Sequence, residues 1–398
     1  MNISLENQIK NYIDLLDIPA ERLQKSGYSK ENLAQELLKK LEEIKSELLE
    51  VDKKLSKKIN VAIIFAMWGE QNRLMPKSSS NPSGENALRE KYNQLSGLFE
   101  NTKNFSWTLY PVDDGCPHDS FGVAQKIVAQ NKLEDHVKVI ALQEGVDKSF
   151  KGLSSVDESR KGGSIAYGAS RAIEDGANII IYTDTDLSVH LGQAGLLLTA
   201  LLTNPSLVAA IGDRNLPGSI KIKDGVRWGK GVKFFRHIQR MVGKEIFSIG
   251  ITDTQAAFKA FTAKAVKELI AKQKQFDFAF DTDWLLNTIQ TFGQSSIKQV
   301  PVVFIDSDRE STSIQQEADY PGMKTWEQLL KGITQTVSSN PNTLDKDLVE
   351  TIMGLDALKL AKLVTIVPPQ LENVRNEDLG KIETMSPKDI VRFIKEHE

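Results

Sequence analysis

The sequence has 398 residues, of which 40% are hydrophobic and 26% are charged, as in folded globular proteins. This length predicts one large α/β domain with appended helical segments, or two domains. The formal net charge is −3, from 50 basic and 53 acidic side chains, so no basic excess indicates a nucleic-acid partner. The single cysteine, Cys116, excludes an intrachain disulfide and predicts a reducing compartment.

The N-terminus and the apolar runs bear on location. The first residues lack the basic start and the apolar run of a secretory signal. No transmembrane segment is expected, because no stretch approaches the roughly 20 apolar residues that span a bilayer. The most apolar run, from Gly195 to Leu202, is much shorter. We therefore expect a cytoplasmic protein, with peripheral attachment to a membrane left open.

Residues 1–58 are expected to be helical. Apolar residues recur there every three or four positions, with Lys and Glu between them. The stripe includes Leu33, Leu37, Leu41, Ile44 and Leu48. Such a stripe indicates either a helix that packs inside the protein or a homo-oligomer contact through the terminal helices.

From Asn60 onward, short apolar runs alternate with helical segments. Strands are expected at 61–66, 107–112, 137–142, 178–183, 207–211 and 299–305, with a further strand-like run that ends at Gly250. Helices are expected at 85–99, 120–131, 164–174, 190–202 with Ser188 as N-cap, 263–274 and 284–291. This alternation predicts an α/β, Rossmann-like domain with a mainly parallel sheet and helices on both faces.

The expected domains are three consecutive segments. An N-terminal helical extension covers 1–58, the α/β domain covers 59–322, and a C-terminal helical segment covers 323–398.

Several carboxylates follow directly after expected strands, namely Glu70, Asp113, Asp114, Asp184 and Asp186. Because ligands of such sheets bind at the carboxyl ends of the strands, we expect these side chains at one edge. Asp also suits turns, so each pair alone is weak evidence.

The Asp-x-Asp sequence Asp184-Thr185-Asp186 ends an apolar strand and is the sharpest of these features. Two carboxylates in one loop offer the hard oxygen ligands that suit Mg²⁺ or Mn²⁺. We therefore expect Asp186 and Asp184 to ligate a metal that bridges a diphosphate. His190 follows the loop and could add a ligand, although a packing role is the more common one.

Positive charge gathers in two places. Lys161-Gly162-Gly163 precedes a helix, where Gly lets the backbone approach an anion and the helix dipole attracts it. Residues 214–244 are rich in Lys and Arg interleaved with glycines and aromatics, which favours an anion pocket. A solvated loop and a solvated helix face are the respective alternatives.

Together these motifs resemble the family 2 glycosyltransferases, which have the GT-A fold. The closest branch is the dolichyl- and polyprenyl-phosphate glucosyl- and mannosyltransferases. The similarity covers about residues 60–310. The matching motifs are Ala66-Met67-Trp68-Gly69-Glu70-Gln71, Val112-Asp113-Asp114-Gly115-Cys116, Lys161-Gly162-Gly163-Ser164, Asp184-Thr185-Asp186-Leu187-Ser188, Ile211-Gly212-Asp213-Arg214, Ile251-Thr252-Asp253-Thr254-Gln255 and Phe278-Ala279-Phe280-Asp281-Thr282-Asp283.

The resemblance implies roles for particular residues. The implied donor-binding residues are Ala66, Trp68, Glu70, Asp113, Lys161, Gly162, Asp184, Thr185 and Arg214. Asp281 would be the catalytic base, with Asp253 as a second catalytic residue beside the acceptor. The implied acceptor-binding residues are Gln255, Lys233 and Asp283. Helix capping and turn formation are the alternatives for Asp281 and Asp253.

The implied activity is that of an inverting glycosyltransferase, which moves a hexose from a nucleotide sugar similar to UDP-glucose with Mg²⁺ or Mn²⁺. The acceptor stays open among a sugar, a lipid phosphate and a small molecule. One alternative is a sugar-phosphate nucleotidyltransferase, which usually has a Gly-rich loop that Ala66–Glu70 lacks. The other is a non-catalytic sugar-nucleotide-binding protein.

Overall fold

The computed structural model describes residues 5–223, 230–306, 322–338 and 344–397, which form two compact units. Each unit joins segments that are distant in sequence. Unit 1 comprises Met1–Asp224, Ala256–Ala271 and Phe292–Arg309, and unit 2 comprises Gly225–Gln255, Lys272–Thr291 and Glu310–Glu398. The division into three consecutive segments stays a prediction.

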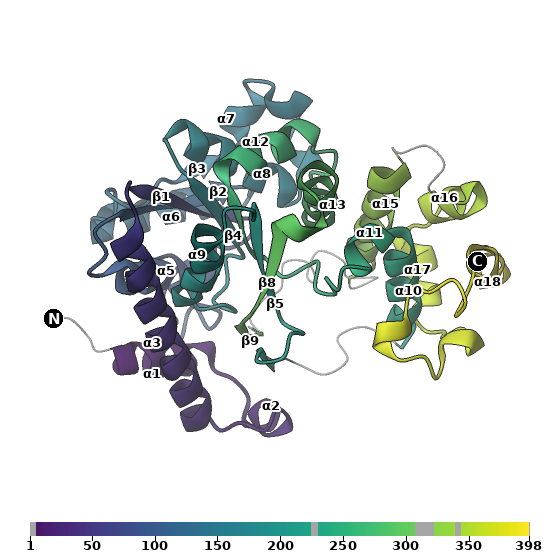
Figure 1. Ribbon diagram of the computed structural model, residues 1–398, viewed down its shortest axis with the longest axis horizontal. Helices are drawn as coiled ribbons and strands as arrows, with labels where there is room; N and C mark the ends of the chain where they lie inside the picture. The colour runs from purple at the N-terminus through teal and green to yellow at the C-terminus, as the bar shows by residue number, and fades with distance from the viewer. Residues whose placement is uncertain (1–4, 224–229, 307–321, 339–343, 398) are drawn as a thin grey trace. The chain divides into compact units, whose positions relative to one another are not determined.

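A seven-stranded sheet forms the centre of unit 1, in the order β3-β2-β1-β4-β7-β5-β8 (Figure 1). The strands are β1 (Ile59–Met67), β2 (Phe105–Asp113), β3 (Ile140–Ala141), β4 (Ile179–Thr183), β5 (Ala209–Asp213), β7 (Phe258–Thr262) and β8 (Ile297–Pro301). Only β7 runs antiparallel to its neighbours among these pairs. Two short strands, β6 (Ile220–Ile222) and β9 (Val303–Ile305), pair in parallel beside it. The predicted α/β class with a mainly parallel sheet is confirmed.

Helices cover both faces of this sheet because successive strand residues point to opposite sides. Ile63 and Phe65 share one hydrophobic cluster with α5 (Ala87–Phe99), α6 (Ser120–Asn131) and α9 (Ala194–Thr203). On the other face, Ile64 and Val112 meet α8 (Gly162–Glu174) at Gly168. A Cβ on Gly168 would lie 2.8 Å from a methyl group of each, so only glycine permits this close approach.

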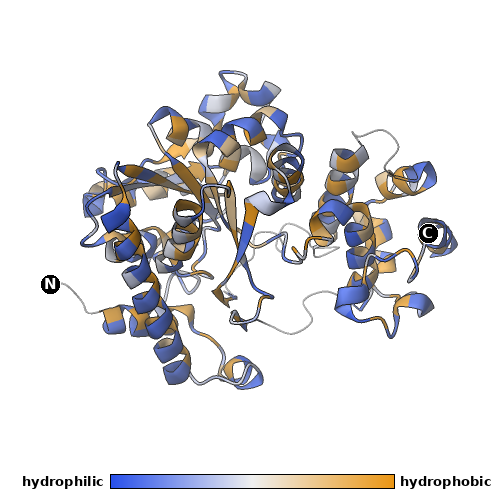
Figure 2. Cartoon of the chain, in the orientation of Figure 1, coloured by the Kyte–Doolittle hydropathy of each residue, from blue (hydrophilic) through white to orange (hydrophobic). Residues whose placement is uncertain are grey.

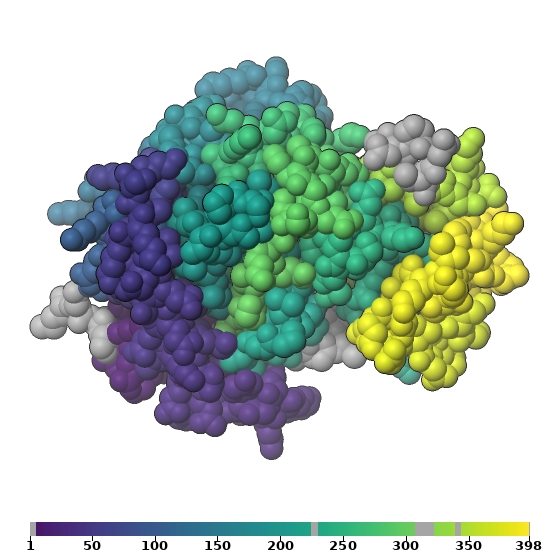
Figure 3. All heavy atoms as spheres, in the orientation of Figure 1, coloured from purple at the N-terminus to yellow at the C-terminus, as the bar shows by residue number. Residues whose placement is uncertain are grey.

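The N-terminal segment folds as predicted into helices, α1 (Leu5–Leu16), α2 (Ala20–Lys25) and α3 (Lys30–Lys54). Ser29 caps α3 by accepting a hydrogen bond from the Asn32 amide. The apolar stripe of α3 is buried in unit 1, and its outer side is hydrophilic (Figure 2). The helix lies against α9 (Figure 3), where a Cβ on Gly195 would come within 2.4 Å of Ile44. The stripe therefore packs internally, and an oligomer through these helices stays a prediction.

Unit 2 is built from helices, as expected for the C-terminal segment. They are α10 (Val232–Val242), α11 (Lys244–Phe247), α13 (Phe280–Phe292), α15 (Met323–Ser338), α16 (Lys346–Met353), α17 (Ala357–Leu363) and α18 (Pro387–His397). Phe234 and Phe235 of α10 are fully buried and contact Phe393 and Trp326 through their rings. Three further helices belong to unit 1, namely α4 (Gln71–Leu74), α7 (Leu142–Val146) and most of α12 (Ala263–Lys272). In the described part of the chain, every helix is too short or too polar to cross a membrane.

Strand β7 was not expected from the sequence, because a lysine interrupts its apolar run. Lys259 is nevertheless fully buried, and its ammonium donates to the carbonyl of Ala256 at 2.6 Å. It also lies 5.4 Å from the ring centroid of Tyr182. These contacts stabilise the charge inside the sheet.

Three local predictions are wrong. The strand expected at 137–142 is reduced to Ile140–Ala141, since α7 begins at Leu142. The strand-like run that ends at Gly250 contains the helix α11, because a short apolar run does not distinguish strand from helix. Ser188 does not cap the following helix; the His190 side chain accepts from the Gly192 amide instead.

The burial of α3 predicts that this helix contributes to the stability of unit 1. Leu37→Ala should lower the free energy of unfolding by about 2–5 kcal/mol, because Leu37 is fully buried. Its exposed neighbour Glu36 provides the control, and Glu36→Ala should change it by less than about 0.5 kcal/mol. Urea unfolding followed by circular dichroism measures both. Equal, small effects would contradict the internal packing of α3.

Candidate functional site

The carboxyl ends of the parallel strands gather the predicted donor residues at one edge of unit 1. Met67 at the end of β1 lies in register with Asp113 at the end of β2. Asp184 follows β4, which is parallel to β1, and Arg214 follows β5. The expected convergence of these side chains on one sheet edge is therefore present.

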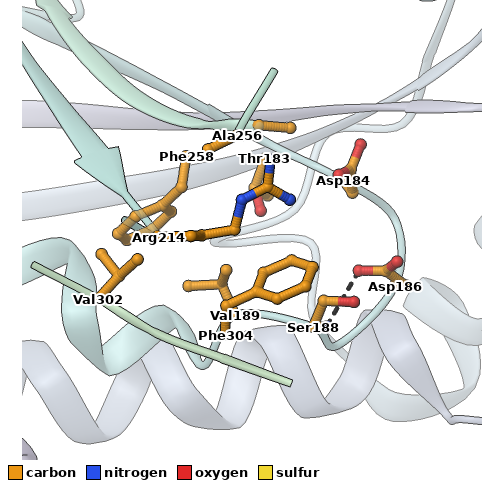
Figure 4. Close-up of a pocket in the computed structure, with 11 residues that line it drawn as sticks. Thr183, Asp184, Asp186, Ser188, Val189, Arg214, Ala256, Phe258, Val302 and Phe304 are labelled. Atoms are coloured by element: carbon orange, nitrogen blue, oxygen red, sulfur yellow. Dashed lines mark hydrogen bonds between the residues drawn. The ribbon is translucent and has the colours of Figure 1, made fainter. Parts of the chain in front are cut away.

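A pocket at this edge contains both acids of the Asp-x-Asp sequence (Figure 4). Arg214 lies in it with its guanidinium carbon 4.7 Å from the ring centroid of Phe304. Figure 4 shows the Arg214 side chain extending across the pocket, with Asp184 and Asp186 on the neighbouring loop. The remaining lining residues are Thr183, Ser188, Val189, Ala256, Ala257, Phe258 and Val302. The pocket thus combines two carboxylates with a cation that stacks on an aromatic ring.

Lys161 supplies a second cation, because its ammonium forms an ion pair with Asp184. Burial raises the pKa of the Asp184 carboxyl. The positive charges of Lys161, Lys91 and Arg214 lower it by more, so the net pKa lies below its ordinary value. Asp184 is therefore ionised at neutral pH. Lys161 itself has a φ of +77°, a conformation that L residues rarely adopt and that often marks functional sites.

Asp114 holds the backbone of Lys161 in this conformation. Its carboxylate accepts hydrogen bonds from the Lys161 amide at 2.7 Å and from the hydroxyls of Ser159 and Ser164 at 2.6 Å each. The side chain is only 3% exposed, and burial raises its pKa. Asp114 is thus a positioning residue, which joins the end of β2 to the loop that precedes α8.

Asp113 differs from its neighbour because one of its oxygens has no partner. Its Oδ2 accepts from the amides of Gly115 and Cys116, whereas the buried Oδ1 receives no hydrogen bond from any described residue. Burial raises the pKa of Asp113 to about 6. Trp68 lies close by, since its ring meets that of His118 at 5.8 Å and the adjacent Gly69 amide donates to Cys116 Sγ. Asp113 can therefore accept a hydrogen bond from a ligand.

Glu70 occupies a different environment from the one expected for a donor-binding residue. It is 7% exposed and pairs with Arg73 at 2.7 Å, and Arg73 also lies 3.3 Å from Glu85. Burial raises the pKa of Glu70 to about 7, although Arg73 opposes the shift. Glu70 thus belongs to a buried charge network, and its contact with a nucleotide stays a prediction.

The other donor residues connect β1 to the Asp-x-Asp loop and to α8. Thr185 donates from its hydroxyl to the Ala66 carbonyl at 2.6 Å, so these two residues bind each other. Gly162 is buried in the first turn of α8. An anion at this turn would meet backbone amides and the positive end of the helix dipole.

Lys91 is a site residue that the sequence analysis missed. It is fully buried, and its ammonium donates to the main-chain carbonyl of Asp186 at 2.7 Å. Burial lowers its pKa to about 8, while the charges of Asp186, Asp184 and Glu85 oppose the shift. A signal was present, since Leu88, Lys91 and Leu95 lie on one face of the helix.

The residues present fit a divalent metal that arrives with its ligand. No group of three or more His, Cys, Asp or Glu side chains within the described ranges could hold an ion alone. Asp184 and Asp186 would supply one or two ligands, and Mg²⁺ or Mn²⁺ commonly takes the rest from substrate phosphates and water. His190 is not aimed at this site: it packs edge-to-face on Tyr12 at 5.0 Å, and burial lowers its pKa to about 3.

The predicted catalytic and acceptor residues lie in unit 2. Asp281 and Asp253 are 3% and 5% exposed, and Asp281 lies in the first turn of α13. Gln255 donates from its side-chain amide to the Thr282 hydroxyl at 3.3 Å, which places Gln255 beside this turn. The structure thus brings Gln255 to the start of α13, while the roles of Asp281 and Asp253 stay predictions.

Asp283 and Lys233 have structural partners within unit 2. The Asp283 carboxylate accepts from the amides of Lys274 and Gln275 and from the side chains of Asn287 and Thr336. Lys233 donates to the Glu372 carbonyl at 2.9 Å. We therefore leave both residues out of the proposed site.

The basic segment 214–244 is divided between two roles. Arg214 lines the pocket, whereas Arg240 donates to the carbonyl of Asn376, as Lys233 does to that of Glu372. Residues 224–229 of this segment, including Arg227, lie outside the described residues. Among the residues that are described, the solvated-face alternative does not fit Arg214, and the pocket interpretation does not fit Lys233 or Arg240.

Comparison with known proteins shows the fold. No protein-family model matches the chain, and no curated protein sequence matches it. Crystal structures of glucosyl-3-phosphoglycerate synthase from Mycobacterium tuberculosis do match, each over 75% of this chain and 85% of that one. The complex with Mn²⁺, UDP and glucosyl-3-phosphoglycerate has a TM-score of 0.50 at 11% identity. The complexes with UDP and with phosphoglyceric acid have TM-scores of 0.50 and 0.51 at 12% identity.

At such low identity these matches establish only a shared architecture. The chain shares the α/β fold of these structures, and the GT-A-like fold class that its motifs implied is confirmed. The closer resemblance to the polyprenyl-phosphate branch is not confirmed.

The two adjacent acids at the end of β2 are predicted to respond differently to the same substitution. Asp114→Asn replaces a charged acceptor of three donors with a neutral amide, and hydrogen bonds to charged groups are the stronger ones, so the free energy of unfolding should fall by about 1–3 kcal/mol. Asp113→Asn is the matched control, because its amide oxygen can keep both backbone contacts; we expect a change below about 0.5 kcal/mol. Chemical denaturation at pH 7.5 measures both. A larger loss for Asp113→Asn would refute the assignment of Asp114 as the positioning residue.

Proposed function

We propose that this chain is a glycosyltransferase that takes a UDP-glucose-like donor together with Mg²⁺ or Mn²⁺. The observation that carries the proposal is one sheet edge with matching chemistry. Asp184 and Asp186 share a pocket with Arg214, Lys161 pairs with Asp184, and Asp113 has an oxygen that no described residue contacts by a hydrogen bond. The matched synthase of the same fold has been crystallised with Mn²⁺ and UDP, which supports the same ligand class here.

Each part of the donor has a complementary group at this edge. A uracil ring carries one N–H group, and the unpartnered Oδ1 of Asp113 is an acceptor for it. The diphosphate would lie near Lys161, Arg214 and the first turn of α8, whose amides and dipole favour an anion. Trp68 beside the Asp113 loop offers an aromatic surface to the base.

Transfer requires that negative charge on the departing nucleoside diphosphate be stabilised. Lys161 and Arg214 would supply fixed positive charge at this point, in a partly buried pocket where such charge acts strongly. Asp186 and Asp184 would hold the metal, which would supply further positive charge at the diphosphate. The donor half of the reaction can therefore be assigned to residues of unit 1.

The acceptor half of the proposal depends on unit 2. Asp281, with Asp253 and Gln255, would meet the acceptor, and Asp281 would take its proton if the transfer inverts the anomeric centre. Inversion stays a prediction that the anomeric configuration of the product decides. A product that keeps the donor's configuration would remove the base role of Asp281 without affecting the donor assignments.

The metal assignment predicts that Asp186→Asn abolishes donor chemistry and leaves the fold intact. Asparagine keeps an oxygen for the Ser188 amide but loses the charge that binds the ion. We expect Mn²⁺-dependent hydrolysis or transfer from UDP-glucose to fall at least about 100-fold, which corresponds to ~2.7 kcal/mol. Asp175→Asn, which removes an acid paired with Lys138 instead, should keep most of the activity.

The same assay separates the alternatives. Undiminished activity in Asp186→Asn would refute the metal site. Pyrophosphate release from UTP and a sugar phosphate would identify a nucleotidyltransferase. A thermal-shift panel of nucleoside diphosphates and sugar nucleotides, with and without Mn²⁺, identifies the donor by mass action. Binding without turnover for any acceptor would indicate a sugar-nucleotide-binding protein.

The raised pKa of Asp113 predicts that UDP binding weakens at low pH. The carboxylate accepts from the base only when ionised, so protonation near pH 6 should reduce the affinity, by a factor approaching ten for each further unit. Calorimetry from pH 5 to 8 measures this dependence. Asp113→Asn should bind UDP weakly with a shallower slope, which reports the titration of the diphosphate alone. Identical slopes for both proteins would contradict the role of Asp113.

A further inference from the structure

We propose that the N-terminal helix α1 is a positioning element of the metal-binding loop and acts through the hydroxyl of Tyr12. The inference rests on the proposed function, because it concerns the same Asp184–Ser188 loop. The sequence motifs that resemble glycosyltransferases lie within residues 60–310, so those motifs assign no role to residues 1–58.

Tyr12 contacts the loop directly. Its hydroxyl donates to the main-chain carbonyl of Leu187 at 2.5 Å, across 175 positions of sequence. Leu187 is the residue after the expected metal ligand Asp186. The Tyr12 ring also packs edge-to-face on His190 at 5.0 Å. One side chain from α1 therefore touches the segment that follows Asp186 at two points.

The loop depends on such contacts because it lies outside the strands and helices. Lys91 donates to the carbonyl of Asp186, Glu85 accepts from the Leu187 amide at 3.1 Å, and the Ile305 amide donates to the Ser188 carbonyl at 2.9 Å. Lys91 and Glu85 come from α5 and the loop before it, and Ile305 comes from β9. The backbone around Asp186 is thus fixed by groups gathered from distant segments, among which Tyr12 fixes the carbonyl of Leu187.

Tyr12 is itself held rigidly, which a positioning residue requires. It is 2% exposed, and Ile9, Ile13 and Leu16 of the same helix are buried beside it. The helix packs on α3, which in turn packs on α9. Without the hydroxyl, the buried Leu187 carbonyl loses its hydrogen bond, and the loop can recover one only by moving. Small displacements of a ligand-holding group weaken binding and catalysis strongly.

The test compares Tyr12→Phe with Tyr110→Phe in the full chain. Both substitutions remove one hydroxyl from a tyrosine that is 2% exposed, and the Tyr110 hydroxyl donates to Asp175 at 2.8 Å, away from the loop. We expect the apparent affinity for Mn²⁺ at saturating UDP to fall about tenfold in Tyr12→Phe and less than twofold in Tyr110→Phe. UDP affinity without metal should be unchanged in both, which a general loss of stability would not produce.

Each outcome is decisive. Equal Mn²⁺ affinities in the two variants, with wild-type UDP binding that depends on Mn²⁺, would overturn the role of Tyr12 and leave the proposed function standing. Wild-type UDP binding that ignores Mn²⁺ would overturn the metal site and this inference with it. Should Tyr12→Phe melt at a much lower temperature than Tyr110→Phe, Leu16→Ala provides a second variant. It loosens the packing of the same helix but keeps the Tyr12 hydroxyl, and it should lower Mn²⁺ affinity in the same direction; an unchanged affinity would overturn the inference.

Discussion

The burial of carboxylates at one sheet edge is the constraint on which this site depends. Parallel strands bring Asp113, Asp114 and Asp184 together, and burial makes the charge of each more costly. The protein compensates in a different way for each acid. Asp184 forms an ion pair with Lys161, and Asp114 accepts three hydrogen bonds. Asp113 has a raised pKa, and its Oδ1 accepts no hydrogen bond from the described residues. The acid that is least compensated is the one best placed to receive a ligand.

The same reasoning separates structural charges from functional ones elsewhere in the chain. Asp283 lies in a motif that resembles an acceptor site, yet it accepts four hydrogen bonds from unit 2, which leaves it no need of a ligand. Lys233 likewise donates a hydrogen bond to the main-chain carbonyl of Glu372. Arg214, by contrast, stacks on Phe304 in a pocket beside two carboxylates. Residue type alone does not make this distinction; the partners of each group do.

The sequence was sufficient for the fold class and for the gathering of the donor residues, because both follow from local periodicity and from acids at strand ends. It failed where a buried charge contradicted the expected pattern. Lys259 interrupts the apolar run of β7, and Lys91 was not identified as a site residue. In both cases the compensating group is a main-chain carbonyl, of Ala256 and Asp186 respectively, whose position depends on tertiary structure. The sequence also did not reveal the pairing of Glu70 with Arg73, and the contact of Glu70 with a nucleotide stays a prediction.

The two units of the chain separate the proposed donor-binding groups from the proposed acceptor-binding groups. The proposed donor groups and metal ligands, with the helices that pack against their loop, belong to unit 1, whereas Asp281, Asp253 and Gln255 belong to unit 2. A site for a nucleotide diphosphate needs fixed charges, since preorganised dipoles act without reorganisation at the moment of reaction. The internal packing of α1 and α3 provides this rigidity to the loop after β4. The proposed acceptor residues belong to the separate unit 2, so substitutions around the start of α13 are expected to leave the internal packing of the donor edge intact.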